Sequence, residues 1–421
     1  MSNAATAPAT ALTFEEKLDR LAEVAVRVGL GLQEGQQMVL TSTVDALPLV
    51  RRVTAQAYKA GANLVTTLLT DEPSSLLRYQ HARGESFDVA ADWLYEGMAQ
   101  AYRNGAARQA IYCSNPALLA KEDPEKVSRA NRSQSKAYRP AMEQITKFKI
   151  NWNILAAATP DWASLVFPDI PADQAVEKLW DAIFTACRIN QPDPVAAWKA
   201  HDANLHKRAD YMNAKRFHSL QYNGPGTNLR VGLADDHKWL GGGSVALNGA
   251  YCIPNMPTEE IFTTPHKDRA DGTVRSTKPL SHQGTLIKDI EVRFENGRIV
   301  EAHASAGESV LHKMLDTDEG ARRLGEVALV PHSSPISASG VLFYNTLFDE
   351  NAASHIALGQ AYSSCFENAE NLKPEDLATR GANESLIHVD WMIGSGEIDI
   401  DGVHADGKTE PLMRKGEWVT E

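Results

Sequence analysis

The chain has 421 residues, enough for two or three domains and a sizeable hydrophobic core. Its 42 Lys and Arg stand against 54 Asp and Glu, which gives a formal net charge of −12, and 43% of its residues are hydrophobic. This acidic balance excludes a nucleic-acid binder that depends on phosphate contacts. No stretch approaches about 18 uninterrupted apolar residues, so no membrane partner is expected.

The cysteines and the N-terminus both predict a cytoplasmic protein. Neither a disulfide framework nor a zinc knuckle is indicated, because the four cysteines are far apart and form no CxxC pair. The first residues, MSNAATAPATALTF, lack the basic region and the long apolar run of a signal peptide. We interpret them as a loose arm.

The first half alternates helical and strand-like patterns. Residues 14–28 place Leu18, Leu21, Val24 and Val28 on one helical face. Two strand-like runs with a helix between them follow, and this βαβ unit implies a parallel sheet. The alternation predicts the following further elements: strands at 37–43, 63–71, 110–113 and 151–159, and helices at 46–62, 88–105, 124–147, 174–187 and 194–206. We therefore expect an α/β domain over residues 1–214.

After Tyr211 the sequence changes to short strands and turns. Asn296 and Gly297 separate two alternating runs, and this pair favours a type I′ hairpin turn because both central residues need a positive φ. The expected fold class is α/β: an N-terminal α/β domain with a parallel sheet, then a mixed α+β domain over residues 215–421. The second domain also carries the candidate site residues.

Several common catalytic motifs and the dinucleotide-binding GxGxxG motif are absent. GLGLQEG, with Gly29, Gly31 and Gly35, has the wrong spacing for GxGxxG and lies before a strand, so it indicates a helix stop. The sequence contains no GxSxG, HExxH or HxxEH. Serine hydrolases and zincins are therefore not indicated.

Two strand-like segments carry unusual carboxylates. In PNMPTEEIFTTP, alternation places Glu260 with Thr258 and Phe262, while Glu259 points the other way; a solvated acidic strand is the alternative. In LGEVALV, Glu326 is the only charge. It lies either in water at a strand end or beside a cation or metal inside the protein, since an unpaired buried carboxylate is costly.

The segment FDENAASHIALGQAY predicts a helix capped by Asp349 or Asn351. His355 and Tyr362 would then lie two turns apart on one face. The alternative is a histidine satisfied inside the core. Glu350 precedes this helix, and spacing alone does not place it at the site.

The segment SLIHVDWMIG predicts a strand with His388 and Asp390 on one face, about 7 Å apart. This pair can ligate a divalent ion, and the carboxylate can bridge to a second ion. Pairing with other residues at a sheet end is the alternative. Together the segments offer three carboxylates and two imidazoles, which suit two metals bridged by a carboxylate and a water, as in a hydrolase. These are Glu260, Glu326, Asp390, His355 and His388.

The ordered set PTEEIFTTP, LGEVALV, ENAASHIALGQAY and LIHVDWMIG resembles the M29 peptidases. The resemblance implies a co-catalytic dinuclear metal site with a tyrosine, Tyr362, beside it. It implies two divalent ions, with zinc expected first and cobalt, manganese or magnesium as alternatives. The implied ligands are Glu260, Glu326, His355, His388 and Asp390.

The predicted function is a metal-dependent aminopeptidase that releases N-terminal residues from short peptides through a metal-activated bridging water. Glu326 is expected nearest both ions, and Tyr362 is expected to donate to the oxyanion or touch a metal. Glu350 or Glu259 is expected to act as general base or to support a ligand, and these two acids are also candidates for recognising the substrate ammonium.

The resemblance further implies a homodimer that encloses a large chamber around the metals. The alternative function is a non-catalytic cation- or nucleotide-binding protein built on the N-terminal βαβ unit. Residues 114–146 have no assigned role, and substrate preference can reside there.

Overall fold

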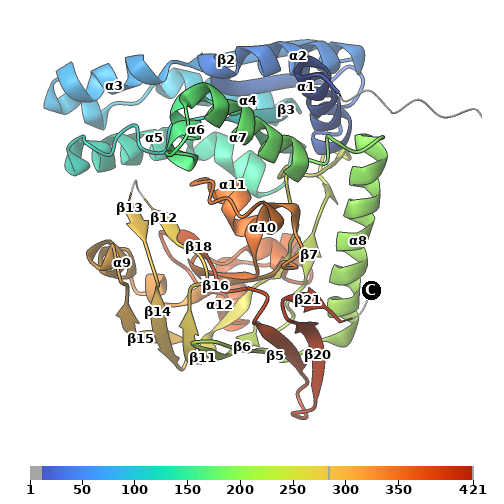
Figure 1. Ribbon diagram of the computed structural model, residues 1–421, viewed down its shortest axis with the longest axis vertical. Coiled ribbons are helices and arrows are strands. Elements are labelled where there is room, and N and C mark those ends of the chain that lie inside the picture. Colours follow the sequence, from blue (N-terminus) through green and yellow to red (C-terminus); the bar gives the residue numbers. More distant parts are fainter. Residues whose placement is uncertain (1–11, 283–284, 420–421) are drawn as a thin grey trace, which may run out of the picture.

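The computed structural model describes residues 12–282 and 285–419. The first half of the chain forms the upper layers in Figure 1 and the second half forms the sheets below them. Helix α8 (Pro194–Lys215) runs down one side and connects the two halves. None of the helices in the described ranges is long and apolar enough to span a membrane.

The first half contains the predicted parallel sheet, in the order β2-β1-β3-β4. Its strands are β1 (Gln37–Thr43), β2 (Leu64–Thr70), β3 (Ala107–Tyr112) and β4 (Trp152–Ala156). Its helices are α1 (Phe14–Val24), α2 (Leu47–Lys59), α3 (Glu72–His81), α4 (Asp92–Arg103), α5 (Pro124–Thr146), α6 (Pro160–Val166) and α7 (Ala172–Ala186). The α/β prediction for this half is confirmed, although α3 and α6 were not expected.

Two helices begin where the sequence expects them because each has an aspartate cap and a proline at the first helical position. Asp123 accepts a hydrogen bond from Glu125 N at the start of α5, and Asp193 accepts one from Ala196 N at the start of α8. The end predicted for α8 near residue 206 is wrong. Apolar residues continue at helical spacing through Met212, and the helix ends where Arg216 adopts a left-handed conformation.

The second half contains two sheets that share one core. The eight-stranded sheet has the order β15-β14-β11-β6-β5-β19-β20-β21, and the five-stranded sheet has the order β18-β17-β16-β10-β7. The strands of the larger sheet are β5 (Ser219–Gly224), β6 (Thr227–Leu233), β11 (Pro265–Arg275), β14 (Glu291–Glu295), β15 (Arg298–His303), β19 (Asp399–Val403), β20 (Thr409–Arg414) and β21 (Glu417–Trp418). The strands of the smaller sheet are β7 (Leu240–Gly241), β10 (Ile261–Thr263), β16 (Leu324–Leu329), β17 (His355–Gly359) and β18 (His388–Met392).

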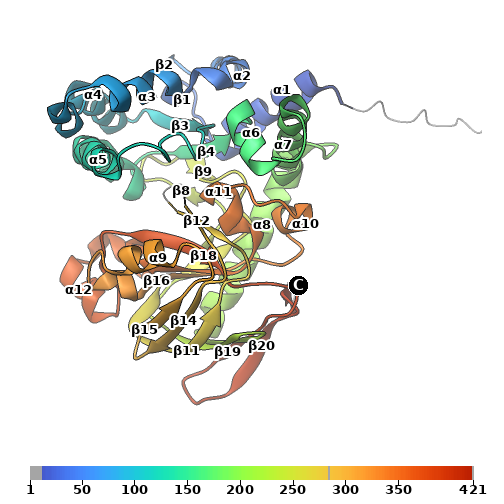
Figure 2. The same cartoon turned by 60° about the vertical axis from the view of Figure 1, so that its left-hand side comes forward.

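Shorter elements complete this half. Helices α10 (Pro335–Ser339) and α11 (Thr346–Asp349) lie between the first half and the five-stranded sheet in both views (Figures 1 and 2). The others are α9 (Glu308–Leu315), α12 (Pro374–Thr379), and two small hairpins, β8 (Ser244–Val245) with β9 (Tyr251–Cys252) and β12 (Leu280–His282) with β13 (Thr285–Ile287). The α+β prediction for the second half is confirmed.

The helix predicted from residue 349 through Tyr362 is wrong. Helix α11 ends at Asp349, a 3-10 turn follows at Glu350–Ala352, and His355 begins strand β17. The run HIALG is buried at every position and pairs with a strand on each side, so sheet packing outweighs an apolar spacing that also fits a helix. The cap is Asn345, whose side chain accepts from Leu347 N, and not Asp349 or Asn351.

The core of the first half includes side chains from the second half. Ile253, Met256, Phe343 and Phe348 belong to the same buried cluster as Leu40 of β1. Trp162 of α6 donates a hydrogen bond from Nε1 to the carbonyl oxygen of Phe343 at 2.5 Å. The segment that carries α10 and α11 is therefore fixed against the first half.

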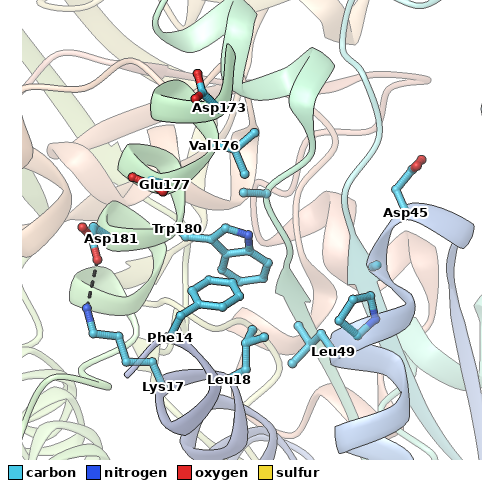
Figure 3. A pocket seen from close by; sticks show the side chains of 13 residues that line it. Phe14, Lys17, Leu18, Asp45, Leu49, Asp173, Val176, Glu177, Trp180 and Asp181 are labelled. Carbon is cyan, nitrogen blue, oxygen red and sulfur yellow. Dashed lines mark hydrogen bonds and ion pairs between the residues drawn. The ribbon is translucent and has the colours of Figure 1, made fainter. Parts of the chain in front are cut away.

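A groove of about 740 Å³ lies on the first half between α1, α2 and α7. Figure 3 shows Phe14, Leu18, Leu49 and Trp180 pointing into it, with the ion pair between Lys17 and Asp181 at its edge. None of the site residues predicted from the sequence lines this groove. The candidate chemistry therefore lies elsewhere, in the five-stranded sheet.

The turn between β14 and β15 gives a prediction about stability. Asn296 and Gly297 both have positive φ, 48° and 79°, as expected for the predicted hairpin turn, and a Cβ on Gly297 would lie 1.8 Å from the Lys267 carbonyl oxygen. We expect Gly297→Val to destabilise the fold by about 1–3 kcal/mol or more, seen as a lower Tm in calorimetry. Gly84→Ala is the control, since nothing lies within 4 Å of its added Cβ and its φ is not positive. Equal Tm values for the two variants would contradict the argument.

Candidate metal centre

The candidate site lies on one face of the five-stranded sheet. Residues directly opposite each other in an antiparallel pair project to the same face. Glu326 of β16 is opposite Ala357 of β17, and Ala357 is opposite Asp390 of β18. One row across three strands therefore carries two carboxylates with an alanine between them.

The adjoining rows carry the two histidines. His355 is opposite Ala328 on β16 and Met392 on β18, and His388 is opposite Gly359. Because Ala328, Ala357 and Gly359 have small side chains or none, space remains between the longer side chains. The register therefore surrounds a small volume with oxygen and nitrogen donors.

The opposite face of these strands explains why the donors project this way. Val327, Ile356, Leu358 and Trp391 are each at most 1% exposed and pack in the core shared with the eight-stranded sheet. Since side chains alternate along a strand, burial of these residues directs Glu326, His355 and Asp390 to the other face.

Glu260 completes the group from the residue before β10. His355 Nε2 lies 3.2 Å from Glu260 Oε2 and 3.8 Å from Glu326 Oε1, and His388 Nε2 lies 3.3 Å from Glu326 Oε2 and 3.4 Å from Asp390 Oδ1. These residues form two sets of donor atoms, each within 4.8 Å of one another: Glu260, Glu326 and His355, and Glu326, His388 and Asp390. Glu326 belongs to both sets.

The outer nitrogen of each histidine is held by a main-chain carbonyl. His355 Nδ1 lies 3.1 Å from the Ala353 oxygen, and His388 Nδ1 lies 2.7 Å from the Gln360 oxygen. A carbonyl oxygen only accepts, so each Nδ1 carries a proton and donates. Each Nε2 therefore faces the carboxylates, which is the arrangement usual for metal-ligating histidines.

The carboxylates and imidazoles strongly perturb one another. Burial and the charges of Asp390 and Glu260 raise the pKa of Glu326 to about 7, although His388 opposes the shift. Burial alone would lower the pKa of each histidine, but close contacts with the carboxylates and their negative charges raise it to about 10 for His355 and about 11 for His388. Burial would likewise raise the pKa of Asp390, but His388 and His355 outweigh it and lower that pKa.

The residues fit divalent cations. Oε2 of Glu260 is buried, and its 3.2 Å contact with His355 Nε2 lacks hydrogen-bond geometry, so an acceptor at the centre of the site remains unsatisfied. With neutral imidazoles, the carboxylates of Glu260, Glu326, Asp390 and nearby Glu350 would bring four negative charges together. Two divalent cations would neutralise this charge, and oxygen and imidazole donors suit several such ions.

Glu350 reaches the site from the 3-10 turn after α11. Its carboxylate accepts a hydrogen bond of 3.4 Å from Asn351 Nδ2. Burial, followed by the charges of Glu260 and Asp390, raises the pKa of Glu350 well above its ordinary value. The structure thus brings Glu350 to the cluster, which sequence spacing alone left unplaced.

Tyr362 lies beside His388, with ring centroids 4.6 Å apart, and contacts Phe262 edge to face at 6.0 Å. Its side chain is 43% exposed, so the tyrosine stands at the accessible rim. Desolvation, followed by the charges of Glu326 and Asp390, raises its pKa well above the ordinary value and keeps its hydroxyl protonated as a donor. It reaches the site from the turn after β17 and not from a helix shared with His355.

Glu259 points away from this cluster. Its carboxylate pairs with Arg188 at 2.7 Å and lies 3.5 Å from His201 Nε2. No pattern in the sequence marks Arg188 or His201 as a site residue. Both belong to the first half, where neither a motif nor a spacing links them to Glu259.

Comparisons with known proteins identify the family. The family of thermophilic metalloproteases (M29) matches residues 14–418. Aminopeptidase T of Thermus thermophilus is 52% identical over 406 residues, which cover 96% of this chain and 99% of the relative. Aminopeptidase 2 of Geobacillus stearothermophilus is 44% identical over 408 residues, which cover 97% and 99% of the two chains.

A solved structure agrees. Wild-type AmpT from Thermus thermophilus superposes with a TM-score of 0.93 at 50% identity, covering 97% of this chain and 100% of that chain. These matches decide against a non-catalytic cation- or nucleotide-binding protein. The chain belongs to the M29 family of metallopeptidases and is a metal-dependent aminopeptidase.

Proposed function

We propose that the site holds two divalent cations that share Glu326. The observation that supports this proposal is the pair of overlapping donor sets, with Glu326 common to both. Glu260 and His355 would hold one cation, and His388 and Asp390 the other. Zinc is the proposed ion because it accepts both imidazole and carboxylate ligands, with cobalt, manganese and magnesium as the alternatives.

When bound, such ions lower the pKa of a water molecule and polarise the scissile carbonyl. The protein supplies the remaining groups. Glu350, whose pKa is raised well above its ordinary value by burial and by neighbouring carboxylates, is suited to act as a general base beside the cations. Tyr362 is suited to donate its hydroxyl proton in a hydrogen bond to the developing oxyanion. The proposed substrates are short peptides with a free N-terminus.

Loss of a shared ligand tests the metal assignment. We expect Glu326→Gln and His388→Ala each to abolish peptidase activity and lower metal content, while circular dichroism stays near that of the native chain. The donors occupy one face of a sheet whose other face forms the core, so the fold should persist. Glu291→Gln, an exposed acid on β14, is the control. Near-normal turnover with full metal content in either site variant would refute the assignment.

Tyr362→Phe should separate metal binding from catalysis. We expect full metal content and a kcat lower by about 10²-fold or more, because a donor to the oxyanion is removed. Glu350→Gln should likewise lower kcat at unchanged metal content, through loss of the proton acceptor. Elemental analysis and steady-state kinetics on the same samples measure both quantities. An unchanged kcat would exclude these roles.

The raised histidine pKa values predict proton release on metal binding. In the metal-free chain at pH 7, His355 and His388 hold protons because their pKa values are about 10 and 11. A cation must displace these protons from Nε2, so metal affinity should rise between pH 6 and about 9. Calorimetric titration in two buffers of different ionisation enthalpy measures the released protons. Binding without proton release would contradict the prediction.

The same shifts have the opposite effect on the metal-free fold. A group whose pKa is raised by folding stabilises the folded state at pH values below its pKa in the unfolded chain. This stabilisation is lost as the pH rises through its pKa in the folded chain. For Glu326 this loss extends to about pH 7, and for the histidines it extends to about 10 and 11. The site's contribution to the Tm of the chelated chain should therefore fall between pH 6 and 9, as calorimetry can measure.

An aminopeptidase must distinguish a free α-ammonium from an acylated nitrogen. Burial of that ammonium without a partner would cost several kcal/mol, so recognition should be strict. We expect hydrolysis of Leu-Gly-Gly and no comparable hydrolysis of its N-acetylated form at equal concentration. Similar rates on both would indicate an amidase or endopeptidase.

We also propose a cytoplasmic homodimer whose domains divide at 214/215. The four cysteines are buried and free, which supports a reducing compartment. The change from a parallel to antiparallel sheets after α8 supports the division. Sedimentation of the purified chain tests the dimer, and a monomer would exclude it.

A further inference from the structure

Glu259 takes part in an almost fully buried ion pair that joins the two halves of the chain. Arg188 Nη2 donates a hydrogen bond to Oε2 at 2.9 Å, and Nη1 lies 2.7 Å from Oε1 in an ion-pair contact that leaves Oε1 without a hydrogen bond. The two side chains are only 14% and 4% exposed. This two-pronged geometry, with one hydrogen bond and one ion-pair contact, restricts the direction of both side chains as well as their separation.

Arg188 is itself held in place. It follows the end of α7 with a φ of 60°, in the left-handed region that non-glycine residues rarely adopt. Its guanidinium lies 4.9 Å from the centre of the Trp198 ring, and Trp198 Nε1 donates to the Cys187 oxygen at 2.7 Å. The guanidinium is therefore positioned by its own half of the chain.

The backbone of Glu259 is fixed from the opposite direction. Its N–H donates to Asn351 Oδ1 at 2.7 Å. Asn351 Nδ2 in turn donates to the Leu347 oxygen at 3.1 Å and to Glu350 at 3.4 Å. One residue thus links the first half to Glu260, its neighbour in sequence, and through Asn351 to Glu350.

We propose that Arg188 and Glu259 are positioning residues that orient Glu260 for the cations. The inference rests on the metal centre proposed above. A buried ion pair adds little net stability, since a well-packed apolar pair often replaces it without loss. Residues that orient a metal ligand have a measurable effect, because their mutation commonly weakens metal affinity about 10–100-fold. The pair therefore supports the metal centre more than it supports the fold.

The first test measures metal affinity of the full chain by competition with a chelator, using Zn²⁺ and Co²⁺ as probes. We expect Glu259→Gln to weaken binding about 10–100-fold and Arg188→Lys, which keeps the charge but not the two-pronged geometry, to weaken it less. With metal saturated, KM should stay near the native value while kcat falls. Unchanged metal affinity in both variants would overturn the proposal.

A double variant separates orientation from packing. Arg188→Met with Glu259→Met removes both charges and keeps apolar bulk, so we expect a Tm near the native value. Metal affinity should nevertheless stay about 10–100-fold weaker, because the contact that orients Glu260 from the first half of the chain is lost. Native metal affinity in the double variant would show that the pair only fills space, and would overturn the proposal.

Two further variants complete the design. Glu410 of β20 forms a part-buried ion pair of 2.5 Å with Lys215 of α8, and Glu410→Gln, which breaks this pair, should leave metal affinity unchanged. Glu260→Gln tests the metal centre itself, and native metal affinity in this variant would refute the proposed function. If only the Arg188 and Glu259 variants keep native metal affinity, the positioning role alone is refuted. A Glu259→Gln variant with native metal affinity and a raised KM for free-amine peptides would instead assign Glu259 to the substrate ammonium.

Discussion

The pleat of the five-stranded sheet is the constraint on which the site depends. Because Val327, Ile356 and Trp391 must face the shared core, their neighbours in the strands must face the other way. Glu326 is thereby crowded against Asp390 in a place where burial and repulsion disfavour the charged form of Glu326, while His388 and His355 favour the charged form of Asp390. The free energy of folding holds these carboxylates together, and divalent cations can then reduce the repulsion between them.

Several other features follow from this concentration of charge. Small residues between the donors leave space for ions, and main-chain carbonyls turn Nε2 of His355 and His388 inward. In the metal-free chain, protons on these nitrogens occupy the places proposed for the metals. The negative charge of the carboxylates would therefore be neutralised by protons in the metal-free chain and by cations in the metal-bound chain. For this reason pH and metal concentration would act on the same equilibrium.

The sequence predicted the strands of the site better than its helix. Glu326 in LGEVALV and His388 in LIHVDWMIG lie in short runs rich in apolar and β-branched residues, which favour strands, and both strands are present. The run after Asn351 fits a helix equally well by spacing, and only its pairing with β16 and β18 decides for a strand. Arg188 could not have been linked to Glu259, because a contact across 71 residues leaves no local pattern.

The packing of Phe343 and Phe348 into the core of the first half has a consequence for how such chains evolve. The change from a parallel sheet to antiparallel sheets suggests two modules that recombination could exchange. A fragment that begins after α8 would, however, expose the aromatic side chains that the first half covers, and it would lose the partner of Glu259. The two halves must therefore be inherited as one unit, even though their sheets are separate.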